Sequence, residues 1–170
     1  MIKKKISCIL CILIAFLLQT TVFQSIALAD VVPNLLLVVT VTYAYLRGRS
    51  SGLLVGFFCG IILDMAYGSV IGLYALIFMT IGFLVGFCQK IYFRQGFILP
   101  IILIVLSDFV YSIYYYITEF LMRGRLHFGF YFVHRILPEV LYTTLVGIVL
   151  YSIIAAVERR LNTKRKENEF

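Results

Sequence analysis

Long apolar runs, each interrupted by a short polar or glycine-containing stretch, dominate the sequence. Six runs are present, with approximate bounds 6–29, 33–46, 51–67, 70–93, 97–121 and 134–157. A helix that crosses the hydrocarbon core of a bilayer needs about 20 predominantly apolar residues, and other backbone conformations are not tolerated facing lipid. The pattern therefore predicts an all-α, polytopic membrane helical bundle with about six transmembrane helices. The second and third runs are short, so we expect them to cross at a tilt within the bundle or to form a re-entrant pair.

The composition excludes a soluble globular domain. Of the 170 residues, 62% are hydrophobic and 14% are charged, whereas a typical soluble domain has about 45–50% apolar and about 25% charged residues. No compositional break or repeat divides residues 1–157, so we expect them to form a single transmembrane domain. Residues 158–170 are expected to form a charged cytoplasmic tail that continues the last helix.

The positive charges predict how the helices are oriented. If the N-terminus is in the cytoplasm, 12 of the 15 Lys and Arg residues lie on the cytoplasmic side. The three on the outer side are Arg123, Arg125 and Arg135. Such a bias follows the rule that cytoplasmic loops are rich in Lys and Arg, so we expect both termini to be cytoplasmic. Because the basic residues lie mostly at the ends of the apolar runs, the net charge of +7 is interpreted as a topology signal. No nucleic-acid partner is expected.

The first apolar run also has features of a signal peptide. Lys3 to Lys5 precede the apolar run, and Ala27-Leu28-Ala29 has the form of a cleavage site. The apolar character continues almost to that site, which favours a retained helix. Cleavage would leave five spans.

Glycines at strict spacing mark two helices as close-packing elements. They are Gly52, Gly56 and Gly60 in the third run, and Gly82 and Gly86 in the fourth. Small residues carry helix association in lipid because they let backbones approach closely. We favour packing within this chain over a face reserved for another protein.

Several polar residues lie inside the apolar runs, where each needs a partner or a purpose. One face of the fifth run carries Asp108, Ser112, Tyr115 and Glu119. The last run carries Glu139 at a comparable depth. These residues predict either a satisfied interhelical network or a polar groove for a small molecule or a partner helix. Asp64, by contrast, is expected to close the turn toward Gly68.

The sequence contains no motif for catalysis, a cofactor or a metal. It has no phosphate-binding loop, no metalloprotease motif and no nucleophile elbow. Cys8 and Cys11 form an isolated C-x-x-C without a second pair of ligands. We therefore expect a protein that is not an enzyme.

One family resembles this arrangement of residues. The chain resembles the MreD family of bacterial rod shape-determining membrane proteins, as a short six-span protein with a lysine-rich start. The residues that carry the resemblance are, in order, Pro33-Asn34-Leu35-Leu36-Leu37, then Arg47-Gly48, and then Gly52, Gly56, Gly60, Asp64, Gly68 and Gly72. The likeness is strongest over residues 33–86. Asn34 stands where many family members have Asp, which leaves a charge-dependent role of that position without support.

The resemblance implies a non-catalytic scaffold of the cell-wall elongation machinery in the bacterial cytoplasmic membrane. It implies an MreC-like single-span membrane protein as partner, with the MreB filament and wall synthases as further partners beside the lipid bilayer. In this hypothesis a groove lined by the stripe from Asp108 to Glu119 receives the partner's helix. Self-association of the chain is left open.

The family is also similar to the substrate-binding S-components of energy-coupling-factor vitamin transporters, which implies an S-component-like bundle. The alternative function is therefore a substrate-binding transporter subunit. It would need an enclosed polar cavity near the outer surface, and the obvious lining is Asp108, Tyr115, Glu119 and Glu139.

Overall fold

The computed structural model describes residues 2–25, 31–68, 72–91, 98–118, 129 and 132–167. The first helical segment is α1 (Ile2–Leu17), continued by a π-helical turn, η1 (Leu18–Val22), and by α2 (Phe23–Ser25). The next helices are α3 (Leu35–Arg47), α4 (Arg49–Tyr67) and α5 (Leu73–Val85), which η2 (Gly86–Ile91) extends. Then follow α6 (Ile98–Tyr116), η4 (Phe132–Ile136) and α8 (Leu137–Glu167). The predicted all-α bundle with six helical segments is confirmed for the described part of the chain.

Four of these segments are long and apolar enough to cross a membrane, namely Ile6–Ser25, Arg49–Tyr67, Ile98–Tyr116 and Phe132–Arg160. The two shorter ones are Leu35–Arg47 and Leu73–Gln89. The prediction of a short second helix is confirmed, but a short third helix is wrong, since α4 has 19 residues. Gly48, at φ 89°, makes the turn after α3 in a single residue, so Arg49 already belongs to α4. The fourth helix is the short one because α5 begins only after Gly72.

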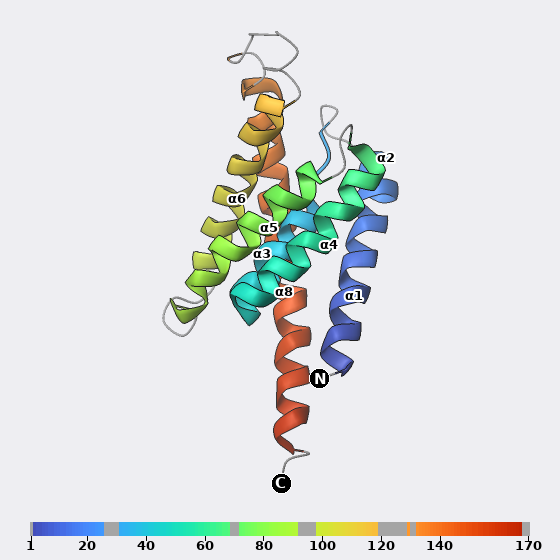
Figure 1. Cartoon of the computed structure of the whole chain (residues 1–170), viewed down its shortest axis with the longest axis vertical. Helices are drawn as coiled ribbons and strands as arrows, with labels where there is room; N and C mark the ends of the chain where they lie inside the picture. Colours follow the sequence, from blue (N-terminus) through green and yellow to red (C-terminus); the bar gives the residue numbers. More distant parts are fainter. Residues whose placement is uncertain are drawn as a thin grey trace.

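Helix α3 forms the centre of the bundle (Figure 1). It packs against α1, α4, α5, α6 and α8, and its residues from Leu35 to Tyr45 are all buried. A helix that is apolar on every side belongs in such an interior position. Because its neighbours surround it, α3 does not need the length that a lipid-facing helix needs.

The start of α3 is fixed by polar side chains from other segments. The Asn34 side-chain oxygen accepts the N–H of Leu37 at 3.2 Å, and the Gln19 side-chain oxygen accepts the N–H of Leu36 at 3.2 Å. The N–H of Asn34 donates to the Thr143 hydroxyl of α8 at 3.1 Å. A helix leaves its first N–H groups without partners inside the helix. Here η1, α8 and the cap residue Asn34 supply the acceptors.

Helices α4 and α5 form a hairpin with glycine-lined contact faces. A Cβ at Gly52 would collide with the carbonyl of Gly82, and one at Gly82 would collide with the carbonyl of Gly52. Gly56 lies in the same way against the backbone of Phe78, and Gly60 against Ala75. The two backbones therefore touch over most of the length of the hairpin.

Asp64 joins the two helices of this hairpin. Its backbone carbonyl accepts the N–H of Gly68 at 2.9 Å. Its carboxylate oxygens accept the N–H groups of Tyr74 at 2.9 Å and Ala75 at 3.0 Å, at the start of α5. The side chain of Asp64 thus caps the next helix, whereas its backbone closes the turn toward Gly68. A carboxylate at a helix N-terminus is favourable because the free N–H groups point toward it.

Both ends of the chain lie at the same end of the bundle (Figure 1). There, Arg47 at the end of α3 forms an ion pair with Glu158 of α8, and the Arg47 guanidinium lies 4.7 Å from the centre of the Tyr43 ring. Glu158 is 5% exposed. The boundary that the sequence suggests between residues 157 and 158 therefore falls inside α8, whose first tail residue is part of the bundle.

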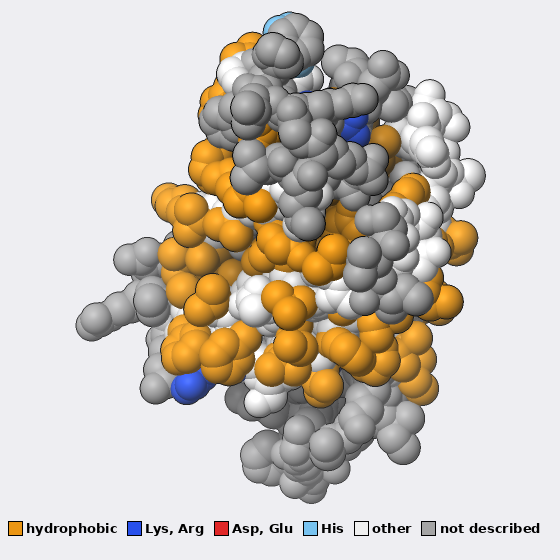
Figure 2. Space-filling model, turned by 45° about the horizontal axis from the view of Figure 1, so that its top comes forward, with side chains coloured by type: hydrophobic (Ala, Val, Ile, Leu, Met, Phe, Trp, Pro, Cys, Tyr) orange, Lys and Arg blue, Asp and Glu red, His pale blue; other side chains and the backbone are white. Residues whose placement is uncertain are grey.

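The outer surface is apolar over much of its area (Figure 2). Large hydrophobic side chains are more than half exposed on several helices, among them Ile9, Leu54, Phe58, Leu84 and Leu145. Exposed apolar area of this extent is expected where the solvent is lipid.

Candidate functional site

Asp108 lies in the interior of the bundle, on α6. It is fully buried, and Ser112, one turn later, is 2% exposed. The Thr143 hydroxyl of α8 is its polar neighbour, but neither Asp108 oxygen has a hydrogen bond of good geometry among the described residues. The same is true of the Ser112 hydroxyl. Neither residue lines the polar cavity at the end of the bundle or the apolar groove between α1 and α4.

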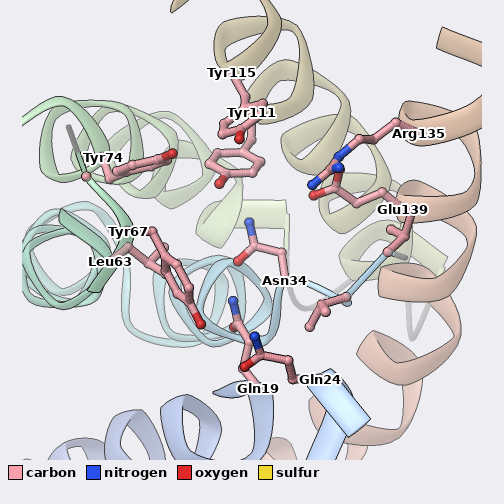
Figure 3. Close-up of a pocket in the computed structure, with 13 residues that line it drawn as sticks. Gln19, Gln24, Asn34, Leu63, Tyr67, Tyr74, Tyr111, Tyr115, Arg135 and Glu139 are labelled. Atoms are coloured by element: carbon pink, nitrogen blue, oxygen red, sulfur yellow. The ribbon is translucent and has the colours of Figure 1, made fainter. Parts of the chain in front are cut away.

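A polar cavity of about 480 Å³ lies among the helices (Figure 3). It is at the end of the bundle away from the termini (Figure 1). Its walls come from the first segment, the start of α3, the α4–α5 turn, α6 and the start of the last helix. Its main polar residues are Gln19, Gln24, Asn34, Tyr67, Tyr74, Tyr111, Tyr115, Arg135 and Glu139. A pocket of about 300–1,000 Å³ with a few convergent polar groups is typical of small-molecule sites.

Tyrosine rings form one side of this cavity. The rings of Tyr111 and Tyr74 lie 6.1 Å apart between centres, and those of Tyr111 and Tyr115 lie 6.4 Å apart. Behind them, Phe78 meets Tyr111 edge to face at 5.6 Å. The hydroxyl of Tyr114, on the same helix, donates to the carbonyl of Leu73 at 3.3 Å. These contacts hold the wall between α5 and α6 in place.

A second cavity, of about 670 Å³, lies between α1 and α4 and has a different character. Its walls are mostly apolar and consist of Cys8, Ile9, Ile12, Leu13, Ser51, Leu54, Val55, Phe58 and Ile62, with Arg47 at the end near the termini. We call it the α1/α4 groove. Helix α1 packs on α3 and α8, so its side toward α4 is left open.

Comparison with known proteins identifies the family. The family model described as rod shape-determining protein MreD matches residues 2–160, nearly the whole chain. The chain belongs to the MreD family. The resemblance inferred from the residues is thereby confirmed, and this MreD-family chain is a membrane-embedded protein of a shape-determining family rather than of an enzyme family. Searches of curated proteins and of solved structures gave no match.

The structure separates the residues that the sequence grouped as one polar groove. Tyr115 and Glu139 line the polar cavity, Asp108 and Ser112 lie in the closed interior, and Glu119 is outside the described residues. The five glycines predicted to pack helices lie at the contact between α4 and the α5–η2 segment, where Gly86 meets the backbone of Arg49; they are Gly52, Gly56, Gly60, Gly82 and Gly86. Among the described residues, no group of three or more His, Cys, Asp or Glu side chains could hold a metal ion.

Sequence reasoning missed Gln19, Gln24 and Arg135 as cavity residues. Gln19 and Gln24 lie in the otherwise apolar first segment, and an amide there is a detectable signal because it is costly in lipid. The sequence predicts Arg135 as an outward-facing basic residue that could neutralise Glu139, but not as part of a cavity. No periodicity within one helix could have shown that it shares a cavity with Asn34.

Proposed function

We propose that this MreD-family chain is a non-catalytic scaffold of the cell-wall elongation machinery that holds a single transmembrane helix of an MreC-like partner in the α1/α4 groove. The α1/α4 groove is the observation that carries the proposal. It lies between two helices that are long and apolar enough to span a membrane. Contacts with the MreB filament and wall synthases would follow from the same complex.

Several features favour this groove over the other helix faces. The glycine-lined faces of α4 and α5 already pack against each other. The face of α6 that carries Asp108 and Ser112 is buried, so a partner helix cannot reach it. In the groove, by contrast, Leu13 is 48% and Phe58 is 56% exposed. A helix seated there would pack against two walls at once, and such packing is what drives helix association in lipid.

The proposal is consistent with both termini in the cytoplasm. In that orientation the Arg47–Glu158 pair and the basic end of α8 face the cytoplasm, while the polar cavity faces outward. The partner's helix would therefore cross beside α1 with its ends near both surfaces.

Photocrosslinking in the native membrane tests this placement. A photoreactive residue at Leu13 or Phe58 is expected to capture an MreC-like protein, while matched probes at Leu84 or Leu145 on lipid-facing surfaces are expected to capture none. The substitution Leu54→Trp should fill the groove and turn rod-shaped cells round, whereas Leu145→Trp should leave cell shape intact. Equal capture from all four positions would show that the groove has no special role.

A further inference from the structure

The polar cavity contains hydrogen-bonding groups that the described structure leaves unused. Asn34 is 3% exposed, and its side-chain oxygen is taken by the N–H of Leu37, yet no described group accepts from its NH₂. The same is true of the NH₂ of Gln19, whose oxygen is taken by Leu36. Figure 3 shows the amides of Asn34 and Gln19 and the hydroxyl of Tyr111 directed into the cavity. These groups face an open cavity, where each can offer a hydrogen bond to a molecule that enters it.

The opposite wall carries both signs of charge. Arg135 and Glu139 are four residues apart, one helical turn, and both line the cavity. The Glu139 carboxylate has no hydrogen bond or ion pair among the described residues. Glu139 is the acidic residue of the cavity lining and can attract a cation there, whereas Arg135 can attract an anion.

The tyrosine rings complete a site for an ammonium group. Tyr74, Tyr111 and Tyr115 lie side by side along one wall, and the face of an aromatic ring attracts a cation. The donors suit an anion instead, because the Arg135 guanidinium and the two amides can each donate to an oxygen. The cavity therefore offers separate places for a positive and a negative group.

We propose that this cavity binds a zwitterion, a small molecule with an ammonium group beside Glu139 and the tyrosines and a carboxylate or phosphate beside Arg135 and the amides of Asn34 and Gln19. The volume of about 480 Å³ accommodates such a molecule with room for a side group. This inference goes beyond the scaffold role and does not depend on it, because the cavity and the α1/α4 groove have separate linings.

The zwitterion has two sources with the same chemistry. It is either a free solute, such as an amino acid or short peptide, or the ethanolamine headgroup of a phospholipid. The experiment therefore has two arms. In the first, the purified full chain in detergent is titrated with glycine, alanyl-alanine and phosphoethanolamine. In the second, it is reconstituted in nanodiscs of phosphatidylethanolamine or of phosphatidylglycerol alone.

Unfolding is followed with a thiol-reactive dye, because the chain has no Trp but has four free cysteines, of which Cys8 and Cys59 are buried. At least one zwitterion, or the phosphatidylethanolamine nanodisc, is expected to raise the unfolding midpoint. Choline and acetate, which carry one charge each, should not raise it at equal concentration. A response in the first arm assigns a solute, and a response in the second arm alone assigns a lipid headgroup.

Two variants and one control connect the response to the site. Glu139→Gln and Arg135→Gln are each expected to weaken binding about tenfold or more, since each removes a charge-assisted contact. Arg135 is exposed, so its variant should fold even if Glu139→Gln does not. Arg160→Gln, an exposed position at the other end of α8, is the matched control and should bind as the unmodified chain does. The proposal is overturned if no zwitterion shifts the midpoint, if choline or acetate binds equally well, or if Arg135→Gln binds unchanged.

Discussion

The contact between Gly52 and Gly82 allows a quantitative test of how the bundle is held together. Each glycine lies against the carbonyl of the other, so a Cβ on either one would collide with backbone that cannot rotate away. An ordinary C···O contact is about 3.3 Å or longer. The backbones of α4 and α5 must therefore separate by roughly 1 Å to admit one methyl group at this contact.

That separation affects the whole hairpin. A gap of about 1 Å forfeits up to about half of the dispersion energy of each atom pair that it opens, and overpacking a well-packed contact costs about 1–3 kcal/mol. We expect Gly52→Ala or Gly82→Ala to lower the free energy of unfolding by about 2 kcal/mol. Both methyl groups need the same separation of the two helices. The loss of unfolding free energy in the double variant should therefore be smaller than the sum of the two single losses, by at least about 1 kcal/mol.

The assay is reversible unfolding of the purified protein in mixed micelles, with the single and double variants compared at equal detergent composition. Gly147→Ala is one control, because a Cβ there would first meet side-chain methyl groups of Ile104 and Val38 at 3.3 Å. Gly129→Ala is another, because a Cβ there would meet no atom within 4 Å in the described structure. If Gly52→Ala costs no more than these controls, or if the double variant is strictly additive, the backbone contact does not hold the hairpin together.

Three further predictions follow from single contacts. Asp64→Ala removes the acceptor of two N–H groups and should lower the free energy of unfolding by about 2 kcal/mol. Asp64→Asn should lower it less, because one side-chain oxygen remains, and equal losses in the two variants would argue against capping by this side chain. Arg47→Gln leaves Glu158 buried without its ion pair and should cost about 3 kcal/mol, whereas Arg47→Met combined with Glu158→Leu should recover most of it, measured by the same unfolding assay. N-terminal sequencing of protein from membranes should find the first helix retained, because Ile12 is buried against the core; a mature chain that begins at Asp30 would contradict this.

The sequence predicted the helical segments well because the bilayer imposes a simple rule on them. Lipid requires both length and apolarity, and the two can be counted along the chain. The error at the third and fourth segments arose at Gly48 and Gly72, whose positive φ values place the turns. A glycine in a sequence indicates that such a turn is allowed, but it does not show which side of it begins the next helix.

The polar cavity could not be predicted from one helix at a time. Helical spacing placed Asp108, Ser112 and Tyr115 on one face, yet that face is only partly open, because α8 covers its deeper half and leaves Tyr115 at the cavity. Both the depth along the helix and its face decide which side chain lines the site, since Tyr111 lines the cavity and its neighbour Ser112 does not. Asn34 shows the same limit, since its role depends on Gln19 and on Thr143, which lie in segments far apart in the sequence.

The first segment forms a wall of both cavities, and this determines which variants can distinguish their roles. Its first turns line the α1/α4 groove through Ile9 and Leu13, and its last turns line the polar cavity through Gln19. Because Gln19 also holds the start of α3, any change that displaces α1 disturbs both sites together. A loss of rod shape on changing α1 therefore assigns no role to either cavity. Phe58 lies in the groove alone and Glu139 in the polar cavity alone, so a shape defect from one and a binding defect from the other would separate the two roles.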